Sequence, residues 1–233
     1  MLKSVRRYFK NCFLFLSLFV FSCASAQDNS PYSRFGLGDA VPQNNISTRG
    51  MGGISAAYTD AISINFSNPA SYSQFQTFIE QRSKQVSSGR VVLDVGMNVE
   101  SRTLIQPNTT NRFTASNVLF SYLQVGMPLR RNWGLSFGLR PLTRVSYMIN
   151  RNDRLMDPVT QLPIDSAVTQ FRGNGGSYLP SIGTGFAIGN FSAGINVGYM
   201  FGNREAQTLR SFINDSVLYY SSDHTNNSSF GDV

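Results

Sequence analysis

Large apolar side chains alternate with small or polar ones along Tyr178–Gly202. One set of alternate positions carries Tyr178, Pro180, Ile182, Thr184, Phe186 and Ile188, then Phe191, Ala193, Ile195, Val197, Tyr199 and Phe201. The other set is mostly glycine, serine, alanine and asparagine. This period of two predicts β-strands whose two faces meet different surroundings. Gly189-Asn190 separates the two runs and predicts a two-residue hairpin turn, because glycine accepts the positive φ that such a turn requires.

The face of this hairpin that carries small and polar residues indicates a membrane-spanning sheet rather than a soluble one. A soluble sheet usually places Lys, Glu, Arg or Thr on the face that meets water. A strand that crosses a membrane needs about 9–11 residues, apolar toward lipid and small or polar toward the lumen. Both arms have that length. We therefore predict an all-β fold, an antiparallel transmembrane β-barrel of the outer membrane.

Three further runs alternate in the same way, at about residues 89–102, 114–127 and 133–147. With the hairpin arms 178–188 and 191–203 they give five predicted strands, or six if residues 75–88 add one. Four charged residues fall on the small-residue side of these runs and are expected to face a polar lumen: Asp94, Glu100, Arg140 and Arg144. On the lipid side, an arginine near the midplane would cost about 2–4 kcal/mol.

The predicted connections alternate in length, with short turns at 128–132 and 189–190 and long polar loops at 148–176 and after 203. Outer-membrane barrels show this asymmetry between periplasmic turns and extracellular loops. Single-chain bacterial barrels normally have an even number of strands and at least eight. Because unpaired strand edges are not tolerated in a bilayer, we expect residues 89–233 to be the N-terminal part of a larger barrel.

The N-terminus has the pattern of an export signal. A basic stretch with Lys3, Arg6, Arg7 and Lys10 precedes the apolar run Cys12–Phe21, and Ala24-Ser25-Ala26 fits a cleavage site. We predict a signal peptide over residues 1–26. A lipoprotein signal ending at Cys23 is the weaker alternative, because Phe21 is a poor residue for a lipobox.

Removing this signal changes the meaning of the composition. The formal net charge of +7 falls to +3 without its four basic residues, so the high isoelectric point does not indicate nucleic-acid binding. Cys12 and Cys23 are the only cysteines, and both lie in the signal. Charged residues make up 14% of the whole sequence, against roughly 25% in soluble domains. The chain that remains after the signal has no cysteine and therefore no thiol chemistry.

Residues 27–88 are rich in Gly, Asn and Ser and do not alternate like membrane strands. Asn68 before Pro69 predicts a short helical turn through Gln74, with Asn68 as the cap and proline at the first helical position. Ile54–Ile62 fits a short helix or a strand. Phe75–Ser88 fits a helical turn or the first strand. A segment with so few apolar residues needs another surface to pack against, and the inside of a barrel provides one.

Three motifs of this region carry a family resemblance. Ser30–Asp39 (SPYSRFGLGD) follows the signal, and Arg49–Gly53 (RGMGG) with Asn68-Pro69-Ala70 precedes the strands. In these motifs the chain resembles outer-membrane proteins of the FadL/TodX type, in the version found in Bacteroidetes-type bacteria. The resemblance implies a barrel of 14 strands with the N-terminal segment, here residues 27–88, folded inside as a hatch. It implies hatch roles for Gly50, Gly52, Gly53, Asn68, Pro69 and Ala70.

The resemblance also implies a function, the uptake of hydrophobic small molecules such as long-chain fatty acids through a channel gated by the hatch. The alternative is a structural or secretion-assisting barrel without small-molecule flux. On either interpretation the chain lies in the bacterial outer membrane. The expected partners are membrane lipid, a hydrophobic ligand in the uptake case and the barrel-assembly machinery, and nucleic acid is excluded.

We expect no enzymatic activity, cofactor or metal. His224 is the only histidine and lies beside Asp223 in a polar stretch without a scaffold for a nucleophile, which predicts a solvated loop residue. The chain after the signal has too few histidine and cysteine residues to provide the ligands of a metal site. Gly36-Leu37-Gly38 and Gly183-Thr184-Gly185 lack the third glycine of a dinucleotide site. In strands, glycine more simply marks the close approach of another backbone, here that of the hatch.

Overall fold

The computed structural model describes residues 30–56, 58–60, 62–79, 86–105, 110, 112–156, 159–161, 163–212 and 222–232. The predicted signal peptide lies outside these residues. The chain divides into two compact units. In the described part, the first unit is Val99–Leu119, and the second holds the residues up to Asn98 and from Phe120 onward. None of the described helices is long or apolar enough to cross a membrane.

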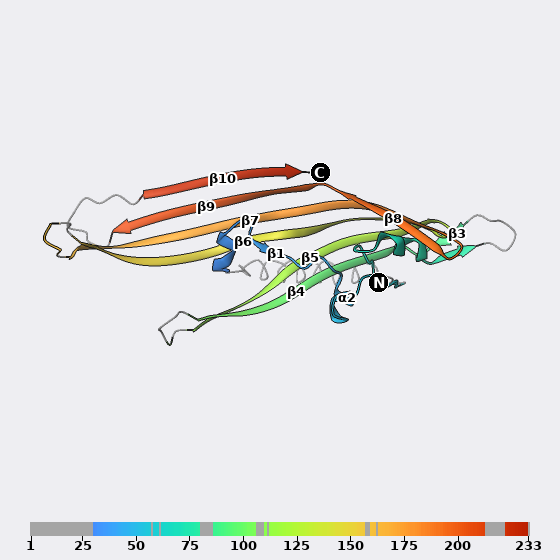
Figure 1. Cartoon of the computed structure of the whole chain (residues 1–233), viewed down its shortest axis with the longest axis horizontal. Helices are drawn as coiled ribbons and strands as arrows, with labels where there is room; N and C mark the ends of the chain where they lie inside the picture. The colour runs from blue at the N-terminus through green and yellow to red at the C-terminus, as the bar shows by residue number, and fades with distance from the viewer. Residues whose placement is uncertain are drawn as a thin grey trace, which may run out of the picture. The chain divides into compact units, whose positions relative to one another are not determined.

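One antiparallel sheet contains most of the described chain (Figure 1). Its strands in the order β10-β9-β7-β6-β5-β4 are Ser222–Asp232, Met200–Phe212, Pro163–Ile188, Trp133–Met156, Arg112–Arg130 and Val92–Ile105. The short strand β1 (Asp39–Ala40) pairs with β6, and β8 (Phe191–Gly198) pairs with β7. A separate pair is formed by β2 (Thr77–Ile79) and β3 (Val86–Gly89). The predicted all-β antiparallel fold is confirmed, and in the described residues the large sheet has β10 and β4 as its two ends.

The predicted alternation produces one continuous apolar face. Val125 is the register partner of Phe137, Phe137 of Ile182, and Ile182 of Val197, so four strands contribute one apolar row. Register partners share a face of a sheet, and their side chains contact each other. Other members of this face are also exposed, among them Leu93, Val95, Met97, Trp133, Phe186, Ile195 and Phe201. We call this side the apolar face.

The Gly189-Asn190 hairpin is confirmed. β7 and β8 pair from Ser181–Gly198 to Ile188–Phe191, and Gly189 has a φ of +59°. The second arm is interrupted at Tyr199, where β8 ends and β9 begins one residue later. Its register partner would be Pro180, which has no N–H to donate, so the ladder loses a bond there without changing register.

The long loops predicted at 148–176 and after 203 are wrong. β6 and β7 continue as a paired hairpin to Met156–Pro163, and β9 pairs with β10 from Met200–Asp232 to Arg210–Ser222. These parts of the strands mix polar and apolar residues on both faces, so they lack the alternation by which a strand is recognised. Their ladders need only backbone groups, which do not depend on side-chain polarity.

The alternation predicted through residue 147 also changes phase. The β6–β7 register shifts between Pro141 and Thr143, which leaves Leu142 as an extra residue of β6. An extra residue moves every following side chain to the other face. Val145 and Tyr147, expected on the lipid side with Phe137, are instead buried at 2% and 5% exposure. The backbone of the N-terminal segment approaches Val145, since a Cβ on Gly38 would lie 2.7 Å from its Cγ2.

The N-terminal region forms only short elements. These are η2 (Pro31–Arg34), α2 (Ile46–Gly50) and η3 (Pro69–Gln74), all in the second unit. The predicted turn after Asn68 is confirmed as η3, although the Asn68 side chain makes no capping hydrogen bond. The described residues of 54–62 form neither helix nor strand, and residues 75–88 contribute β2 and part of β3 instead of a strand of the large sheet.

The first unit consists of the adjoining ends of β4 and β5. Thr103 and Thr114 join their hydroxyls at 3.0 Å, and Ser116 donates to Ser101 at 3.1 Å. Glu100 and Arg102 form an ion pair at 2.9 Å, and they lie two residues apart on the same face of one strand. Cross-strand hydroxyl pairs of this kind stabilise a two-stranded ribbon through its polar residues.

Replacing Gly189 tests the hairpin turn. Gly189→Val is expected to destabilise the folded protein by about 1–2 kcal/mol, because a β-branched residue is strained at positive φ. Gly189→Asn is the matched control, since asparagine tolerates this conformation better. The measurement is the urea midpoint of the refolded full-length protein. Equal midpoints for the two variants would show that the turn does not depend on this φ.

Candidate functional site

The N-terminal segment, residues 30–75, packs on strands of the second unit, on the side opposite the apolar face, with contacts to β4, β5, β6, β7 and β8. Its contacts with the strands of the second unit are largely polar. Buried polar residues of the segment include Ser30, Ser33, Asn45, Thr48, Asn65, Ser71 and Ser73. Its exposed large side chains include Tyr32, Phe35, Leu37, Ile46, Met51, Ile54 and Ile62. The segment also buries apolar side chains, namely Val41, Ile64, Phe66, Tyr72 and Phe75. It is therefore held to the sheet by hydrogen bonds, close backbone contacts and apolar burial together.

The Asn68-Pro69-Ala70 motif lies against glycines of the opening hairpin. A Cβ on Gly185 would lie 2.2 Å from the carbonyl oxygen of Pro69, and one on Gly194 would lie 2.7 Å from the amide nitrogen of Ala70. A Cβ on Gly134 of β6 would likewise meet the carbonyl oxygen of Tyr72. The expected close approach of another backbone to the strand glycines is thus present at these positions. Only glycine leaves room for η3 here.

Tyr72 connects η3 to β8. Its side chain is 1% exposed, and its hydroxyl donates to Asn196 Oδ1 at 3.0 Å. Asn196 Nδ2 donates in turn to the carbonyl of Phe66 at 2.8 Å, which fixes its amide orientation. Burial raises the pKa of Tyr72, so its hydroxyl stays a neutral donor at physiological pH. Its ring stacks on Phe75 at 5.7 Å, within a small apolar cluster completed by Ile64 and Val92.

Asp94 connects the segment to β4. Its carboxylate accepts the backbone N–H of Ile64 at 2.9 Å and the hydroxyl of Tyr122 at 3.2 Å. The Tyr122 oxygen also accepts the backbone N–H of Ile46 at 3.0 Å. One carboxylate and one phenol therefore satisfy two backbone donors of the segment, which regular secondary structure does not satisfy.

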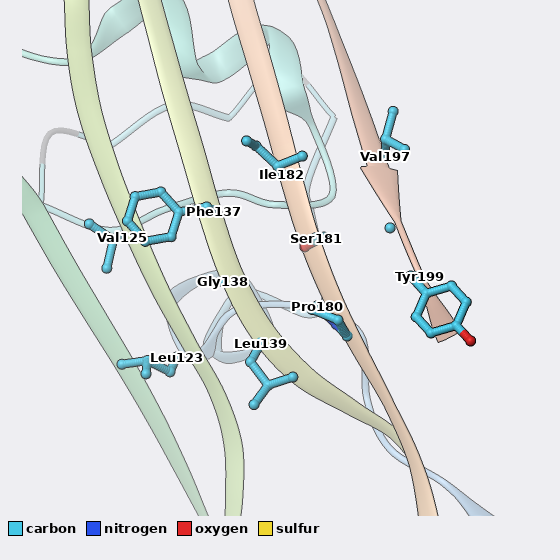
Figure 2. Close-up of a pocket in the computed structure, with 11 residues that line it drawn as sticks. Leu123, Val125, Phe137, Gly138, Leu139, Pro180, Ser181, Ile182, Val197 and Tyr199 are labelled. Atoms are coloured by element: carbon cyan, nitrogen blue, oxygen red, sulfur yellow. The ribbon is translucent and has the colours of Figure 1, made fainter. Parts of the chain in front are cut away.

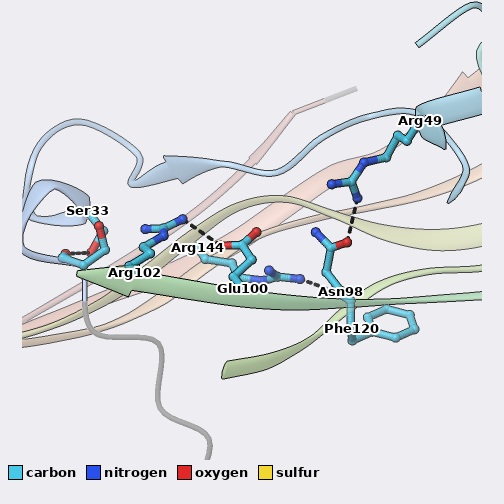
Figure 3. Close-up of polar contacts among 8 residues, drawn as sticks. Ser33, Arg49, Asn98, Glu100, Arg102, Phe120 and Arg144 are labelled. Carbon is cyan, nitrogen blue, oxygen red and sulfur yellow. Dashed lines mark hydrogen bonds and ion pairs between the residues drawn. The ribbon is translucent and has the colours of Figure 1, made fainter. Parts of the chain in front are cut away.

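Two further predicted residues contact neighbouring elements. The Arg140 guanidinium lies over the Phe66 ring, 4.8 Å from its centre. The Arg144 guanidinium donates to the carbonyl of Phe120 on β5 (Figure 3). Figure 3 also shows Arg49 of α2 donating to Asn98 of β4, at 2.9 Å. Glu100 lies in the first unit with Arg102. A lumen-facing role for Asp94, Glu100 and Arg140 stays a prediction. Arg144 follows the extra residue Leu142, so it does not share the strand face of Arg140 that the sequence predicted.

The RGMGG glycines have a local structural reason. α2 begins at Ile46, directly after the cap residue Asn45, whose side chain accepts from the Thr48 N–H at 3.0 Å. After the helix, Gly52 and Gly53 have φ values of +77° and +86°, and the Gly53 N–H donates to the carbonyl of Thr48 at 2.7 Å. Glycines at positive φ terminate helices in this way. Gly50 has ordinary φ and open space around its Cβ position. A hatch function for these glycines stays a prediction.

Sequence reasoning missed Tyr72, Tyr122 and Asn196, which supply the main contacts between the segment and the strands. A signal was present for Asn196, an amide in a run of glycine and serine on the small-residue side. No comparable signal marked the two tyrosines, because aromatic residues also fit a lipid face. The described residues contain no cluster of ligands that could hold a metal ion.

The apolar face carries a groove of about 580 Å³ (Figure 2). Leu123 and Leu139 lie along one side, Val197 and Tyr199 along the other, and Ile182 between them. The groove lies where Pro180 interrupts the ladder to Tyr199. It is open and apolar, and it faces away from the N-terminal segment.

A sequence model of the BamG family matches residues 8–233. The chain belongs to the BamG family. The name relates this family to the barrel-assembly machinery of the outer membrane. The match does not support the resemblance to the FadL/TodX type. Neither the curated proteins nor the solved structures contain a match to the chain.

Removing one hydroxyl tests the polar attachment of the segment. Tyr72→Phe is expected to destabilise the protein by about 1–3 kcal/mol, because Asn196 Oδ1 loses its donor in a buried position. Tyr32→Phe is the control, since the Tyr32 side chain is 74% exposed. The measurement is urea unfolding followed by protease sensitivity of the N-terminal segment. Equal stability of the two variants would contradict a structural role for the Tyr72–Asn196 bond.

Proposed function

We infer that this protein is a non-enzymatic outer-membrane barrel component that works with the barrel-assembly machinery. Membership of the BamG family is the observation that carries this proposal. Uptake of fatty acids through a gated channel has less support. It derives from the FadL/TodX resemblance, and the apolar groove lies on the face away from the segment that would act as the gate.

The apolar face supports placement of the sheet in a membrane. The apolar part of β7, from Tyr178 to Ile188, has the roughly 9–11 residues that a tilted strand needs to cross a bilayer. Exposed residues of this part and of its neighbour β8 include Ile182 at 54%, Phe186 at 48% and Ile195 at 62%. In water such a continuous apolar surface would promote aggregation, whereas in a membrane it contacts acyl chains. The polar extensions of β6, β7, β9 and β10 would project beyond the bilayer.

The contacts of the N-terminal segment favour a structural role for the barrel over a channel function. Its contacts with the strands use buried polar groups, such as the Tyr72–Asn196 pair and the Asp94–Ile64 bond. Glycines leave η3 in direct contact with the strands. A hydrophobic molecule passing between segment and strands would break these hydrogen bonds and provide no replacement for them. We therefore assign the segment a structural role inside the barrel.

The placement in lipid is tested by adding one charge. Ile195→Arg is expected to destabilise the inserted barrel by about 2–4 kcal/mol and to lower its amount in the outer membrane. Asn152→Arg is the control, because Asn152 is exposed in the polar extension of β6. The measurement is the heat-modifiable fraction of the full-length protein in isolated outer membranes. Equal fractions for the two variants would contradict the assignment of the apolar face to lipid.

The link to barrel assembly is tested by affinity purification of the full-length protein from detergent-solubilised outer membranes. The expected result is stable co-purification of the central barrel subunit of the assembly machinery, and reduced levels of other outer-membrane barrels after depletion of this protein. Fatty-acid uptake is measured in the same depleted cells. Loss of uptake with normal levels of other barrels would overturn the proposal and favour the channel.

A further inference from the structure

A polar pocket lies on the sheet in addition to the apolar groove. It has a volume of about 200 Å³ and is lined by Arg172, Gly173 and Asn174 of β7 and by Glu205 and Gln207 of β9. Asn174 and Glu205 are register partners, and so are Arg172 and Gln207, so these four side chains share one face of the sheet. The pocket therefore brings together one cationic side chain, one anionic side chain and two amides.

This pocket lies on the same side of the sheet as the apolar face. Arg204 donates to two backbone carbonyls of the N-terminal segment, so the next side chain along β9, Glu205, points away from that segment. On β7, the Arg34 guanidinium of the segment covers the Phe171 ring at 4.4 Å, so Arg172 also points away from it. Two strands therefore place the charges of the pocket on the apolar side independently.

The two charges of the pocket lie on different strands. Arg172 and Glu205 are exposed, and neither forms an ion pair within the part of the chain that the structure describes. Gln207 donates to Asp223 of β10 at 2.9 Å, which brings a second carboxylate to the β9 side of the pocket. The pocket thus has a cationic side on β7 and an acidic side on β9 and β10.

Aromatic side chains lie between this pocket and the apolar groove. Tyr178 and Phe201 are register partners with ring centres 6.0 Å apart, and the Tyr199 ring lies 6.4 Å from that of Phe201. Leu139, Pro180 and Tyr199 form the end of the groove that is nearest to them (Figure 2). Aromatic residues of membrane proteins gather at the level of the headgroups. The order along the strands is therefore apolar groove, aromatic boundary and polar pocket.

The spacing of the groove and the pocket matches the length of one lipid. Pro180 ends the groove and Asn174 begins the pocket, six residues apart on β7. Six residues of antiparallel strand extend about 20 Å, and one leaflet with its headgroups is also about 20 Å thick. Gly176 adds no side chain to this face between them. A lipid that lies along β7 can therefore place its headgroup at Arg172 and the end of an acyl chain in the groove.

We propose that this part of the sheet binds one phospholipid that carries a phosphate and a primary amine, such as phosphatidylethanolamine. Arg172 binds the phosphate, because a guanidinium matches the geometry of phosphate oxygens. Glu205 accepts hydrogen bonds from the ammonium group, and Asp223 adds negative charge on that side. An acyl chain runs past Tyr178 into the apolar groove. The inference rests on the membrane placement in the proposed function and adds the class of lipid that the barrel selects.

The lipid selectivity of the full-length protein tests this site. The heat-modifiable protein is delipidated in detergent, and its binding of phosphatidylethanolamine and of phosphatidylglycerol with the same acyl chains is measured by native mass spectrometry. We expect phosphatidylethanolamine to bind about tenfold more tightly, because phosphatidylglycerol has no ammonium group for Glu205. Glu205→Gln should remove this preference, and Arg172→Gln should weaken the binding of both lipids about tenfold. Equal affinity of the wild type for the two lipids would overturn the proposal.

Arg154→Gln is the matched control for the loss of a positive charge. Arg154 is exposed on the polar extension of β6, where its register partner is Ser166, and it does not line the pocket. This variant should bind both lipids like the wild type. Equal effects of Arg172→Gln and Arg154→Gln would show that the headgroup responds only to overall charge, and the site would then be wrong.

The acyl part of the site is tested in the groove. Ile182→Trp fills the groove and should weaken the binding of long-chain phosphatidylethanolamine about tenfold, because the end of the acyl chain loses its apolar contacts. Ile195→Trp is the control, since Ile195 is exposed on the apolar face but does not line the groove. A short-chain phosphatidylethanolamine, which does not reach the groove from the pocket, should bind equally to both variants. Equal binding of the long-chain lipid to both variants would overturn the proposal.

These results are distinguishable from a failure of the proposed function. Co-purification of the assembly machinery is measured in a separate experiment without added lipid. A heat-modifiable protein that shows no preference for phosphatidylethanolamine would overturn the lipid site alone. A wild-type protein that never becomes heat-modifiable would overturn the membrane placement and the lipid site together.

Discussion

The long β6–β7 ladder is the interaction on which the rest of the sheet depends. It runs from Trp133–Phe186 to Met156–Pro163 with two register shifts. Every N–H and C=O inside a bilayer must find a partner in the protein, so such ladders are the condition for a strand to cross a membrane. β6 and β7 then supply the edges for β5, β1, β8 and β9. Where the ladder is incomplete, at Pro180, the structure has its apolar groove.

Glycine and polar side chains determine how the N-terminal segment meets the strands. The backbone of η3 contacts the strands at Gly134, Gly185 and Gly194, where a side chain on any other residue would clash with it. Asp94, Tyr122 and Asn196 satisfy backbone groups of the segment. The same arrangement leaves large apolar side chains of the segment exposed, among them Tyr32 and Phe35. Hydrogen bonds therefore act together with the buried apolar cluster of Ile64, Tyr72, Phe75 and Val92 in attaching the segment.

Residues 30–43 are attached to the strands by a short ladder and by side chains. The Arg204 guanidinium donates to the carbonyls of Arg34 and Gly36, and β1 adds two register pairs with β6. On the polar extension of β6, Arg151 and Asp153 form an ion pair at 2.9 Å. Charged side chains on a strand reduce unselective strand addition.

The sequence by itself determined the all-β class, the hairpin at Gly189-Asn190, the apolar face and the helical turn after Asn68, because each follows from local periodicity or turn chemistry. It did not reveal the polar extensions of β6, β7, β9 and β10, since backbone pairing leaves no mark in a polar sequence. It also missed the phase change at Leu142, which depends on the register with β7. Only the tertiary structure brought Tyr72 to Asn196 and β1 to β6, because residues so far apart in the chain meet through the arrangement of the strands.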